Sequence, residues 1–475
     1  MPDPSALDSE TSAPARIAER RRQANNRVVA FDDDPTGSQS VHGVSVVTEL
    51  DPALYAAALA ELASTAFILT NSRSLDEADA VELVSGVARD VFTLARDGGW
   101  QLDAVSRSDS CLRGHVIAEV GALDAVRREV FGSGYDGALF VPSYFEAGRY
   151  TEGDVHYAVV DGNPIPVGES EFAKDATFGF DSSNLKDFLA EKSAGAIDAD
   201  QVLSLSLETI RTGGAAAVTE VLDGCHDLQW VVVNATEYRD LEVVVEGLQA
   251  SSRTFVHRTG PSFVRALSGI AEYGTLTPQQ IRAPQQSRAD AADSGGHGLA
   301  VVGSHVGQTA RQVERARERG GVVEVELSVP ALVQADAAAE IARATVEVVA
   351  GLADNDVMFY TSRDLVTGSD AADSLAIART VSSAVVEVVR ASLAARPAWV
   401  IGKGGITSHD VLVRGLGVQR ATVLGQLFPG MVSVLRPEQA TEDVLGIPYV
   451  VFAGNVGDEH ALADAIELFR RRQRD

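Results

Sequence analysis

Short apolar runs alternate with longer amphipathic stretches along most of this chain, and this alternation constrains the fold more than any other feature. The runs at 28–31, 66–71, 102–106 and 137–141 are each short enough for a buried strand, and the segments after the first three have the composition or apolar spacing of helices. Strands that alternate with helices are typical of βαβ units. We therefore predict an α/β fold with a mostly parallel sheet flanked by helices.

A second α/β pattern follows a polar segment. Residues 275–297 are rich in Gln, Pro, Gly and Ser, which is typical of a linker. Further strands are predicted at 299–302, 322–327, 357–360, 398–401 and 449–452. Because 475 residues are too many for one ordinary core, we predict two domains. They cover 27–274 and 298–475, joined by a linker over 275–297.

Two segments of the first part of the chain break the alternation. Residues 1–26 are polar and are predicted to be partly disordered, ending in a short basic helix around Arg16 to Arg22. Residues 142–180 are rich in Gly, Pro and Tyr, which predicts hairpins and an excursion loop in place of another βα unit. Loops of this length are often substrate-binding elements.

Polar clusters directly follow three predicted strands of the first domain. Asp32, Asp33 and Asp34 follow the first strand, Arg73 lies just after the second, and the block RSDSCLRGH at 107–115 follows the third. Since the carboxyl ends of parallel strands share one edge of a sheet, these clusters should lie close together, where α/β proteins bind ligands. Adjacent carboxylates repel each other unless a cation, a proton or a substrate hydroxyl compensates. A solvated acidic turn is the alternative.

The arginines of these clusters favour an anionic ligand. Planar guanidinium groups such as those of Arg73, Arg107 and Arg113 suit a carboxylate or a phosphate, and Asp109 among them could orient a hydroxyl. The net charge of −27 means that an anion must be attracted locally, and it argues against nucleic acid as a partner.

Three glycine-rich junctions in the second domain each follow a predicted strand. They read GKGGITS at 402–408, AGNVGDE at 453–459 and GSH at 303–305. Glycines let backbone N–H groups approach phosphate oxygens. A helix cap would explain any one of them, but three together favour a nucleotide-binding domain.

Several other classes are disfavoured by the sequence. Cys111 and Cys225 are too few for a disulfide framework or a zinc site, and the histidines lack metal-ligand spacing. No signal peptide and no apolar stretch of membrane-spanning length is visible. We therefore expect a cytoplasmic protein with no membrane partner. The apolar stretch at 372–394 suits a core helix or a homodimer interface equally well.

Taken together, the motifs resemble those of the four-carbon acid sugar kinase family, also known as the DUF1537 family. The segments that carry the resemblance run in order from about Arg27: DDDPTG, TNSR, RSDSCLRG, PSYFEAGRYTEG, ESEFAKD, GSH, KGGITSHDVLVRGLGV and AGNVGDEHAL. The resemblance implies an N-terminal sugar-binding domain and a C-terminal nucleotide-binding domain. It also implies ATP-dependent phosphorylation of threonate, erythronate or 3-oxo-tetronate.

The resemblance further assigns site residues. Asp33 and Asp34 match the family's paired catalytic aspartates; one would accept the proton of the attacking hydroxyl, and the other would help hold Mg²⁺, with Asp34 as the candidate ligand. The implied substrate contacts are Asp33, Arg73, Asp109, Ser110, Cys111, Leu112 and Arg113. The implied ATP contacts are Ser304, Gly404, Gly405, Ile406, Thr407, Gly454, Asn455, Val456 and Gly457.

The sequence departs from the family pattern close to the substrate. The family's usual aspartate is missing from 38–42, Cys111 stands where threonine is usual, and Arg107 stands where lysine is common.

Two other functions remain open from the sequence. VVAFDDDPT also fits the DxDxT signature of haloacid-dehalogenase-type phosphatases, with Asp32 as nucleophile and Asp34 as acid. That interpretation leaves the three glycine junctions unused. A sensor that binds sugar acids without turnover is the non-enzymatic alternative.

Overall fold

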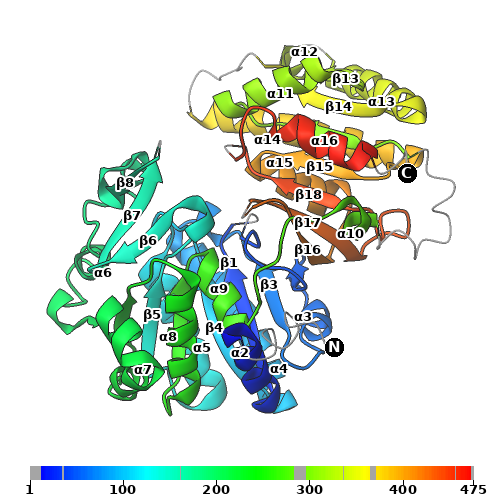
Figure 1. The fold of residues 1–475 in the computed structure, drawn as a ribbon. Coiled ribbons are helices and arrows are strands. Elements are labelled where there is room, and N and C mark those ends of the chain that lie inside the picture. Colours follow the sequence, from blue (N-terminus) through cyan, green and yellow to red (C-terminus); the bar gives the residue numbers. More distant parts are fainter. Residues whose placement is uncertain are drawn as a thin grey trace, which may run out of the picture. The chain divides into compact units, whose positions relative to one another are not determined.

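The computed structural model describes residues 12–34, 37–160, 162–282, 296–334, 336–363, 371–429, 431–454 and 456–471. The chain divides into two compact units, Met1–Tyr273 and Gly274–Asp475, which we call the first and second units. Figure 1 shows a sheet with helices packed on it in each of them.

The first unit is built on a parallel sheet with the strand order β2-β3-β1-β4-β11-β5-β10-β9. Its strands are β1 (Asn26–Asp32), β2 (Ser45–Val47), β3 (Thr65–Leu69), β4 (Gln101–Arg107), β5 (Gly137–Val141), β9 (Leu203–Leu205), β10 (Gln229–Val233) and β11 (Phe255–Thr259). β1, β3, β5 and β11 are buried along their whole length, as expected for strands covered on both faces. The predicted α/β fold with a mostly parallel sheet is confirmed.

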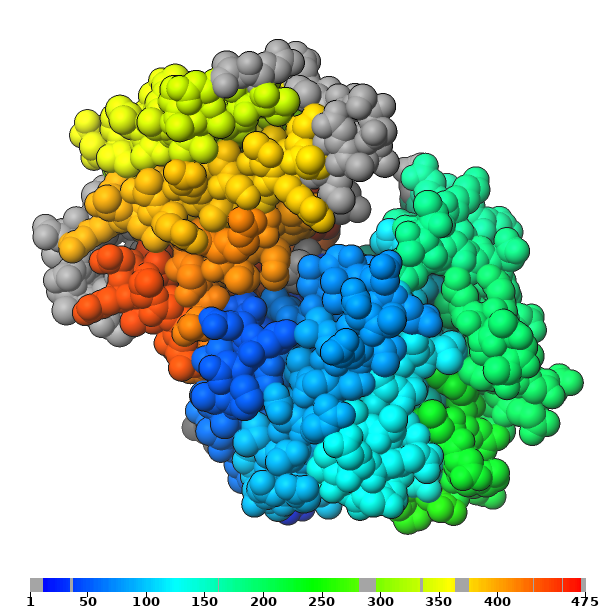
Figure 2. Space-filling view, turned by 180° about the vertical axis from the view of Figure 1, so that it is seen from behind, coloured from blue at the N-terminus to red at the C-terminus, as the bar shows by residue number. Residues whose placement is uncertain are grey.

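Helices cover both faces of this sheet. α3 (Pro52–Ala58), α4 (Glu77–Gly98), α5 (Val116–Phe131) and α6 (Leu185–Lys192) contribute to one apolar core with the sheet. Seen from behind, the segments of α3, α4 and α5 appear in blue to cyan (Figure 2). α2 (Ala13–Gln23), α8 (Tyr238–Ala250) and α9 (Pro261–Ser268) contact one another, and α7 (Gly214–Asp223) contacts α8 (Figure 1).

A small antiparallel sheet interrupts the βα pattern after β5. Its strands are β6 (Arg149–Glu152), β7 (Val155–Val160) and β8 (Asn163–Pro166). It occupies part of the segment 142–180, where the Gly, Pro and Tyr content predicted hairpins. The structure therefore agrees with the predicted excursion.

The second unit contains a mixed sheet with the order β13-β14-β12-β15-β18-β17-β16. Five strands are parallel: β12 (Leu299–Val302), β13 (Val322–Leu327), β14 (Asp356–Thr361), β15 (Val400–Lys403) and β18 (Tyr449–Phe452). α11 (Gly307–Arg319) contacts α16 (Ala461–Arg471), while α12 (Val329–Gln334), α13 (Ala337–Asp354) and α14 (Ala371–Ser392) contact one another. The short helix α15 (Gly405–Asp410) follows β15.

The sequence prediction missed a long hairpin in the second unit. β16 (Arg420–Phe428) pairs antiparallel with β17 (Met431–Gln439), and β17 pairs antiparallel with β18. Buried and half-buried residues alternate along β16, as in a strand with one face on the core. The short strand β9 was also missed.

Residues in the predicted linker and at the amino end form helices. Leu276 and the helix α10 (Pro278–Arg282) belong to the second unit, where Leu276 and Ile281 are buried in the core. Residues 283–295 of the predicted linker, and residues 1–11 of the predicted disordered segment, lie outside the described residues. The predicted basic helix at Arg16 to Arg22 lies within α2.

Candidate functional site

The sheet of the first unit brings together the three polar clusters predicted at its carboxyl edge. β1 lies between β3 and β4, and Asp32 at the end of β1 is aligned with Leu69 of β3 and Arg107 of β4. The segments carrying Asp33, Arg73 and the block after Arg107 therefore leave the sheet side by side. Each of the three consecutive aspartates then has a different partner.

Asp32 is paired with Arg107 below the surface. Nη2 and Nε of Arg107 lie 2.5 and 2.6 Å from Oδ1 of Asp32. The side chain of Arg107 is 5% exposed and that of Asp32 is 0% exposed. Gly37 closes over this pair, because a Cβ there would lie 2.0 Å from Oδ2 of Asp32. Burial raises the pKa of Asp32 to about 7, although Arg107 opposes the shift.

Asp33 is held by a buried network that continues into the domain. Ser108 donates a hydrogen bond of 2.7 Å to Oδ2 of Asp33, and Arg258 donates one of 2.5 Å to the Ser108 hydroxyl. The guanidinium of Arg258 lies 4.0 Å from Asp33 and 2.5 Å from Glu119. Oδ1 of Asp33 is buried and has no hydrogen-bond partner in the described part of the chain.

Asp34 begins a partly exposed chain of alternating charges, which we call the outer ion-pair chain. Asp34 is ion-paired with Arg73, and Arg73 lies 3.9 Å from Asp109. Asp109 pairs with Arg113 at 2.7 Å. The exposed fractions of Asp34, Arg73 and Arg113 are 25%, 20% and 30%, so solvent reaches these side chains but not those of Asp32 and Asp33.

The excursion supports this outer chain. Arg113 lies 3.8 Å from Asp175, and its guanidinium carbon stands 5.2 Å from the centre of the Phe172 ring. Both residues come from the segment ESEFAKD. Burial acts to raise the pKa of Asp109, but Arg113 and Arg73 together hold that pKa below its usual value.

Three other predicted substrate contacts lie in the loop after β4 but are largely buried. Ser110 accepts a hydrogen bond of 2.8 Å through its carbonyl oxygen from Nε2 of His156, which fixes the loop to β7. Cys111 and Leu112 pack in the apolar core. Leu112 has φ of 69°, a left-handed conformation that few non-glycine residues adopt. Burial raises the pKa of the Cys111 thiol to about 11, so it is not an activated nucleophile.

The sequence prediction missed the groups below the aspartates. Arg258, Glu119 and Ser108 come from β11, α5 and the loop after β4, and Glu119 also accepts hydrogen bonds from Ser72 and Ser106. An arginine at the end of the predicted strand, in the segment FVHRT, was the one available signal, since a buried charge requires a partner.

The second unit brings its three glycine-rich junctions together in the same way. They follow β12, β15 and β18, which are neighbours in the sheet. A Cβ on Gly303 would lie 2.3 Å from Oγ1 of Thr407, and one on Gly454 would lie 2.6 Å from Oγ of Ser304. Each junction therefore leaves no room for a side chain where it meets its neighbour.

Polar side chains fix the backbone of these junctions. The Thr309 hydroxyl donates a hydrogen bond of 2.8 Å to the Gly454 carbonyl and lies 3.1 Å from Oγ of Ser304, within hydrogen-bond distance. Lys403 Nζ donates to the carbonyls of Ala453 at 2.7 Å and Gly454 at 3.2 Å. Gln308 donates to the Gly457 carbonyl at 2.8 Å.

The other predicted nucleotide contacts differ in exposure. Gly405 and Ile406 are exposed, Ile406 to 76%, and Thr407 and Val456 are half-buried. Gly404 has φ of 122°, in a region that favours glycine. Asn455 lies outside the described residues.

No cluster of three or more metal-ligand side chains occurs in the described ranges. Mg²⁺ does not need one, because it is usually held by one or two carboxylates together with waters and substrate phosphates. The unpartnered Oδ1 of Asp33 is one such donor.

Comparisons with known proteins match both units. A family model described as a sugar-binding N-terminal domain matches residues 28–267, and one described as a nucleotide-binding C-terminal domain matches residues 299–462. This chain belongs to the four-carbon acid sugar kinase (DUF1537) family. The recognition made from its motifs is confirmed, and so is the presence of sugar-binding and nucleotide-binding domains. A comparison with curated proteins finds no match.

Two solved structures of similar length share the fold. A Haemophilus influenzae protein of the DUF1537 family has 19% identity and a TM-score of 0.62 over 94% of this chain and 99% of that chain. A Salmonella typhimurium LT2 protein, provisionally described as a tRNA synthase, has 16% identity and a TM-score of 0.67 over the same shares. Both likenesses concern the fold alone. In the described part of the chain, no helix is long and apolar enough to cross a membrane.

Proposed function

We propose that this chain is an ATP-dependent kinase that phosphorylates a hydroxyl of a small sugar acid of the threonate, erythronate or 3-oxo-tetronate type. The outer ion-pair chain is the observation that carries the proposal. It offers two arginines and two carboxylates at the ligand-binding edge of the sugar-binding domain, all partly open to solvent. A site for a sugar acid needs both kinds of group, because arginines bind the carboxylate of the ligand and carboxylates accept hydrogen bonds from its hydroxyls.

Arg73 and Arg113 would hold the carboxylate of the substrate. Arg73 is ion-paired with Asp34. A substrate carboxylate on Arg73 would take over part of that pairing, and Asp34 would then be free to accept a hydrogen bond from the attacking hydroxyl. Substrate binding would thus prepare the proton acceptor.

Asp34 fits the role of general base better than Asp33. Its side chain is 25% exposed, whereas that of Asp33 is 1% exposed beneath Ser108 and Arg258. A base has to come within hydrogen-bond distance of the proton it takes. We assign Asp33 to positioning and to metal binding through its unpartnered oxygen.

The glycine junctions of the second unit would hold ATP. Ser304, Gly404 and Gly454 lie at the point where the junctions meet. The backbone N–H groups of Ser304 and Gly454 suit phosphate oxygens, whereas that of Gly404 donates a hydrogen bond of 2.8 Å to the Phe452 carbonyl and fixes the junction. The exposed side chains of Ile406 and Val306 could pack against the adenine ring of ATP. Mg²⁺, when bound, would offset the charge of the transferred phosphoryl group.

The geometry disfavours the phosphatase alternative. Its nucleophile would be Asp32, whose side chain is 0% exposed and is bound by Arg107. A nucleophile has to reach a phosphorus atom, and Asp32 would first have to break a buried ion pair. The sensor alternative uses the same sugar-binding edge, so activity is what separates it from the kinase.

The test is ADP release from Mg²⁺-ATP across four- to six-carbon sugar acids, with free phosphate followed in parallel. We expect ADP with one or a few acids and no matching phosphate. Asp34→Asn should lower turnover by about 10²- to 10⁴-fold, the usual contribution of a general base. Asp90→Asn is the matched control, because Asp90 is an exposed residue of α4.

Each alternative has its own outcome. Phosphate release from sugar phosphates without ATP would support the phosphatase. Binding of a sugar acid by calorimetry without ADP release would support the sensor. Full turnover in Asp34→Asn with the fold intact would remove Asp34 as the base.

A further inference from the structure

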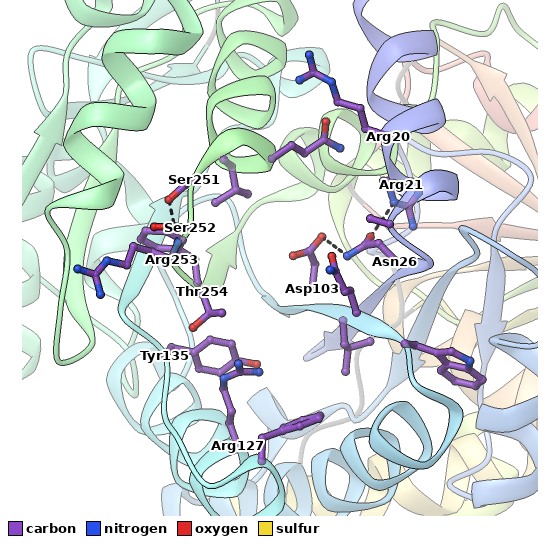
Figure 3. A pocket seen from close by; sticks show the side chains of 18 residues that line it. Arg20, Arg21, Asn26, Asp103, Arg127, Tyr135, Ser251, Ser252, Arg253 and Thr254 are labelled. Carbon is purple, nitrogen blue, oxygen red and sulfur yellow. Dashed lines mark hydrogen bonds between the residues drawn. The ribbon is translucent and has the colours of Figure 1, made fainter.

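A cavity of about 450 Å³ lies in the first unit, away from the predicted site residues (Figure 3). Its wall includes Asn26 at the start of β1, Gln101 at the start of β4 and Phe255 at the start of β11. The helices α2 and α8 contribute further residues to it. A volume of this size is typical of sites for small organic ligands.

The cavity and the candidate site occupy opposite edges of one sheet. β1, β4 and β11 begin at the cavity and end at Asp32, Arg107 and Thr259. A strand of seven residues rises about 3.3 Å per residue, so the two edges lie about 20 Å apart. A ligand in the cavity would therefore not touch the outer ion-pair chain.

The charge of the cavity wall is positive although the whole chain is strongly negative. Four arginines line it, Arg20, Arg21, Arg127 and Arg253, against the single carboxylate of Asp103. Arg253 lies 3.3 Å from Asp136. Arg20, Arg21 and Arg127 have no carboxylate within 4.0 Å among the residues that the structure describes.

Arg21 is the most unusual of the four. It is 4% exposed, and its three hydrogen bonds go to neutral acceptors: Oδ1 of Asn26 at 3.1 Å and the carbonyls of Ser268 and Ser64 at 2.9 and 2.8 Å. Burial lowers the pKa of Arg21 to about 10, and it stays charged at neutral pH. Only the more distant carboxylate of Asp103 opposes this shift, so the buried charge is incompletely compensated, and a further anion nearby would offset its cost.

Other wall groups suit the rest of a ligand. The guanidinium of Arg127 stands 4.7 Å from the centre of the Tyr135 ring and 5.1 Å from that of Phe131, which orients it. Oε1 of Gln249 is buried without a hydrogen-bond partner in the described part of the chain. This oxygen can accept a hydrogen bond from a ligand hydroxyl, and so can the carboxylate of Asp103.

We propose that this cavity is a second ligand site, for a small organic anion that carries phosphate or carboxylate on a hydroxylated body. The arginines would bind the anionic group, and Gln249 with Asp103 would bind hydroxyls. The inference rests on the wall of the cavity and is independent of the kinase activity.

The test is calorimetric titration of the whole chain at low ionic strength, with inorganic pyrophosphate as the phosphate probe and succinate as the carboxylate probe. We expect one of them to bind, and Arg20→Gln with Arg127→Gln to weaken that binding at least tenfold. Hydrogen exchange should slow at residues 24–27, 101–103 and 253–255 when the probe is bound. Stronger binding of one probe identifies the anionic group that the site prefers.

Two matched variants locate the binding. Arg239→Gln removes an exposed arginine of α8 outside the cavity and should leave the affinity unchanged. Arg73→Gln should leave the slowed hydrogen exchange at residues 24–27, 101–103 and 253–255 unchanged, because Arg73 lies at the other edge of the sheet. Arg20→Gln alone, at an exposed position, keeps the test valid if the double variant unfolds. The proposal is overturned if neither probe binds, if the double variant binds normally, or if only Arg73→Gln abolishes binding.

Discussion

The carboxyl edges of the sheets in the two units carry different kinds of residue. In the first unit the edge carries charged side chains, with Asp32, Asp33 and Asp34 facing Arg107, Arg258 and Arg73. In the second unit the corresponding edge carries glycines and polar groups that fix their backbone. The same arrangement of parallel strands therefore supports two kinds of recognition.

The difference follows from what each edge would bind. Sugar acids differ in the position of hydroxyls and of one carboxylate, so directional side chains are needed to tell them apart. Triphosphate oxygens are alike, and backbone N–H groups suffice for them if no side chain stands in the way. Ligand recognition at the first edge then depends on charged side chains whose charges are compensated by partners. Recognition at the second edge depends on space that no side chain fills. Each dependence can be tested separately.

Removing one charge below the first edge should have the largest effect on stability. Glu119→Gln removes the nearer counter-charge of the buried Arg258, which lies 2.5 Å from Glu119, and leaves only Asp33 at 4.0 Å. The side chains of Arg258 and Glu119 are at most 3% exposed. Breaking a buried pair in this way costs about 3–5 kcal/mol. We expect a marked fall in the midpoint of urea unfolding, measured on the transition of the first unit.

The matched control is Glu129→Gln. Glu129 pairs with Arg89 at 2.8 Å on the surface, and both side chains are about half exposed. Solvent screens such a pair, so little or no change is expected. Equal effects of the two substitutions would show that the network below Asp33 is not the source of stability that we assign to it.

Adding one methyl group at the second edge should have a smaller effect, mainly on nucleotide binding. In Gly303→Ala the new Cβ would lie 2.3 Å from Oγ1 and 3.3 Å from Cβ of Thr407, so the Thr407 side chain would have to move. Forced repacking of this kind costs about 1–3 kcal/mol. We expect ATP affinity to fall by about tenfold or more in calorimetric titration.

Gly274→Ala provides the control, since a Cβ there has nothing within 4 Å. Its ATP affinity should equal that of the unchanged chain. If Gly303→Ala also binds ATP normally, the three junctions are not the nucleotide site. Recognition at the second edge would then not depend on the space left by its glycines.

The two edges also differ in how far the sequence predicts them. Strand ends and their order in the chain are local features, so the positions of Asp33, Arg73, Asp109 and the glycine junctions could be predicted from apolar runs and turn residues. The pairing of each carboxylate with its arginine could not be predicted. The partner of Asp32 comes from 75 positions further along the chain, and that of Glu119 from 139 positions further.

The hairpin of β16 and β17 was missed for a related reason. β16 alternates in burial with a period of two, but the hairpin follows a helical segment in a domain where strands and helices otherwise alternate. No strand was predicted between those at 398–401 and 449–452, because an antiparallel hairpin breaks the regular pattern of the domain. The cavity at the amino edge was equally hidden, because its wall combines α2 with residues of β4, α5 and α8.

The smallest predicted effect concerns Lys403, a buried cation of the second edge. Lys403 is 0% exposed, stands 3.8 Å over the Phe452 ring, and has no carboxylate within 4.0 Å in the described ranges, unlike the arginines of the first edge. Burial lowers the pKa of Lys403 from 10.5 to about 7. Between these two values the unfolded chain binds more protons than the folded one, so the free energy of unfolding should rise with pH.

The rise should amount to about 1 kcal/mol between pH 7 and pH 8, and the stability should fall again as the pH drops towards 7. Lys403→Met removes the titrating group and should flatten this dependence, measured on the unfolding transition of the second unit. Other groups titrate equally in both proteins, so the difference between the two curves isolates Lys403. Parallel curves would mean that Lys403 keeps its charge through this range, and the second edge would then have a compensated cation as the first edge does.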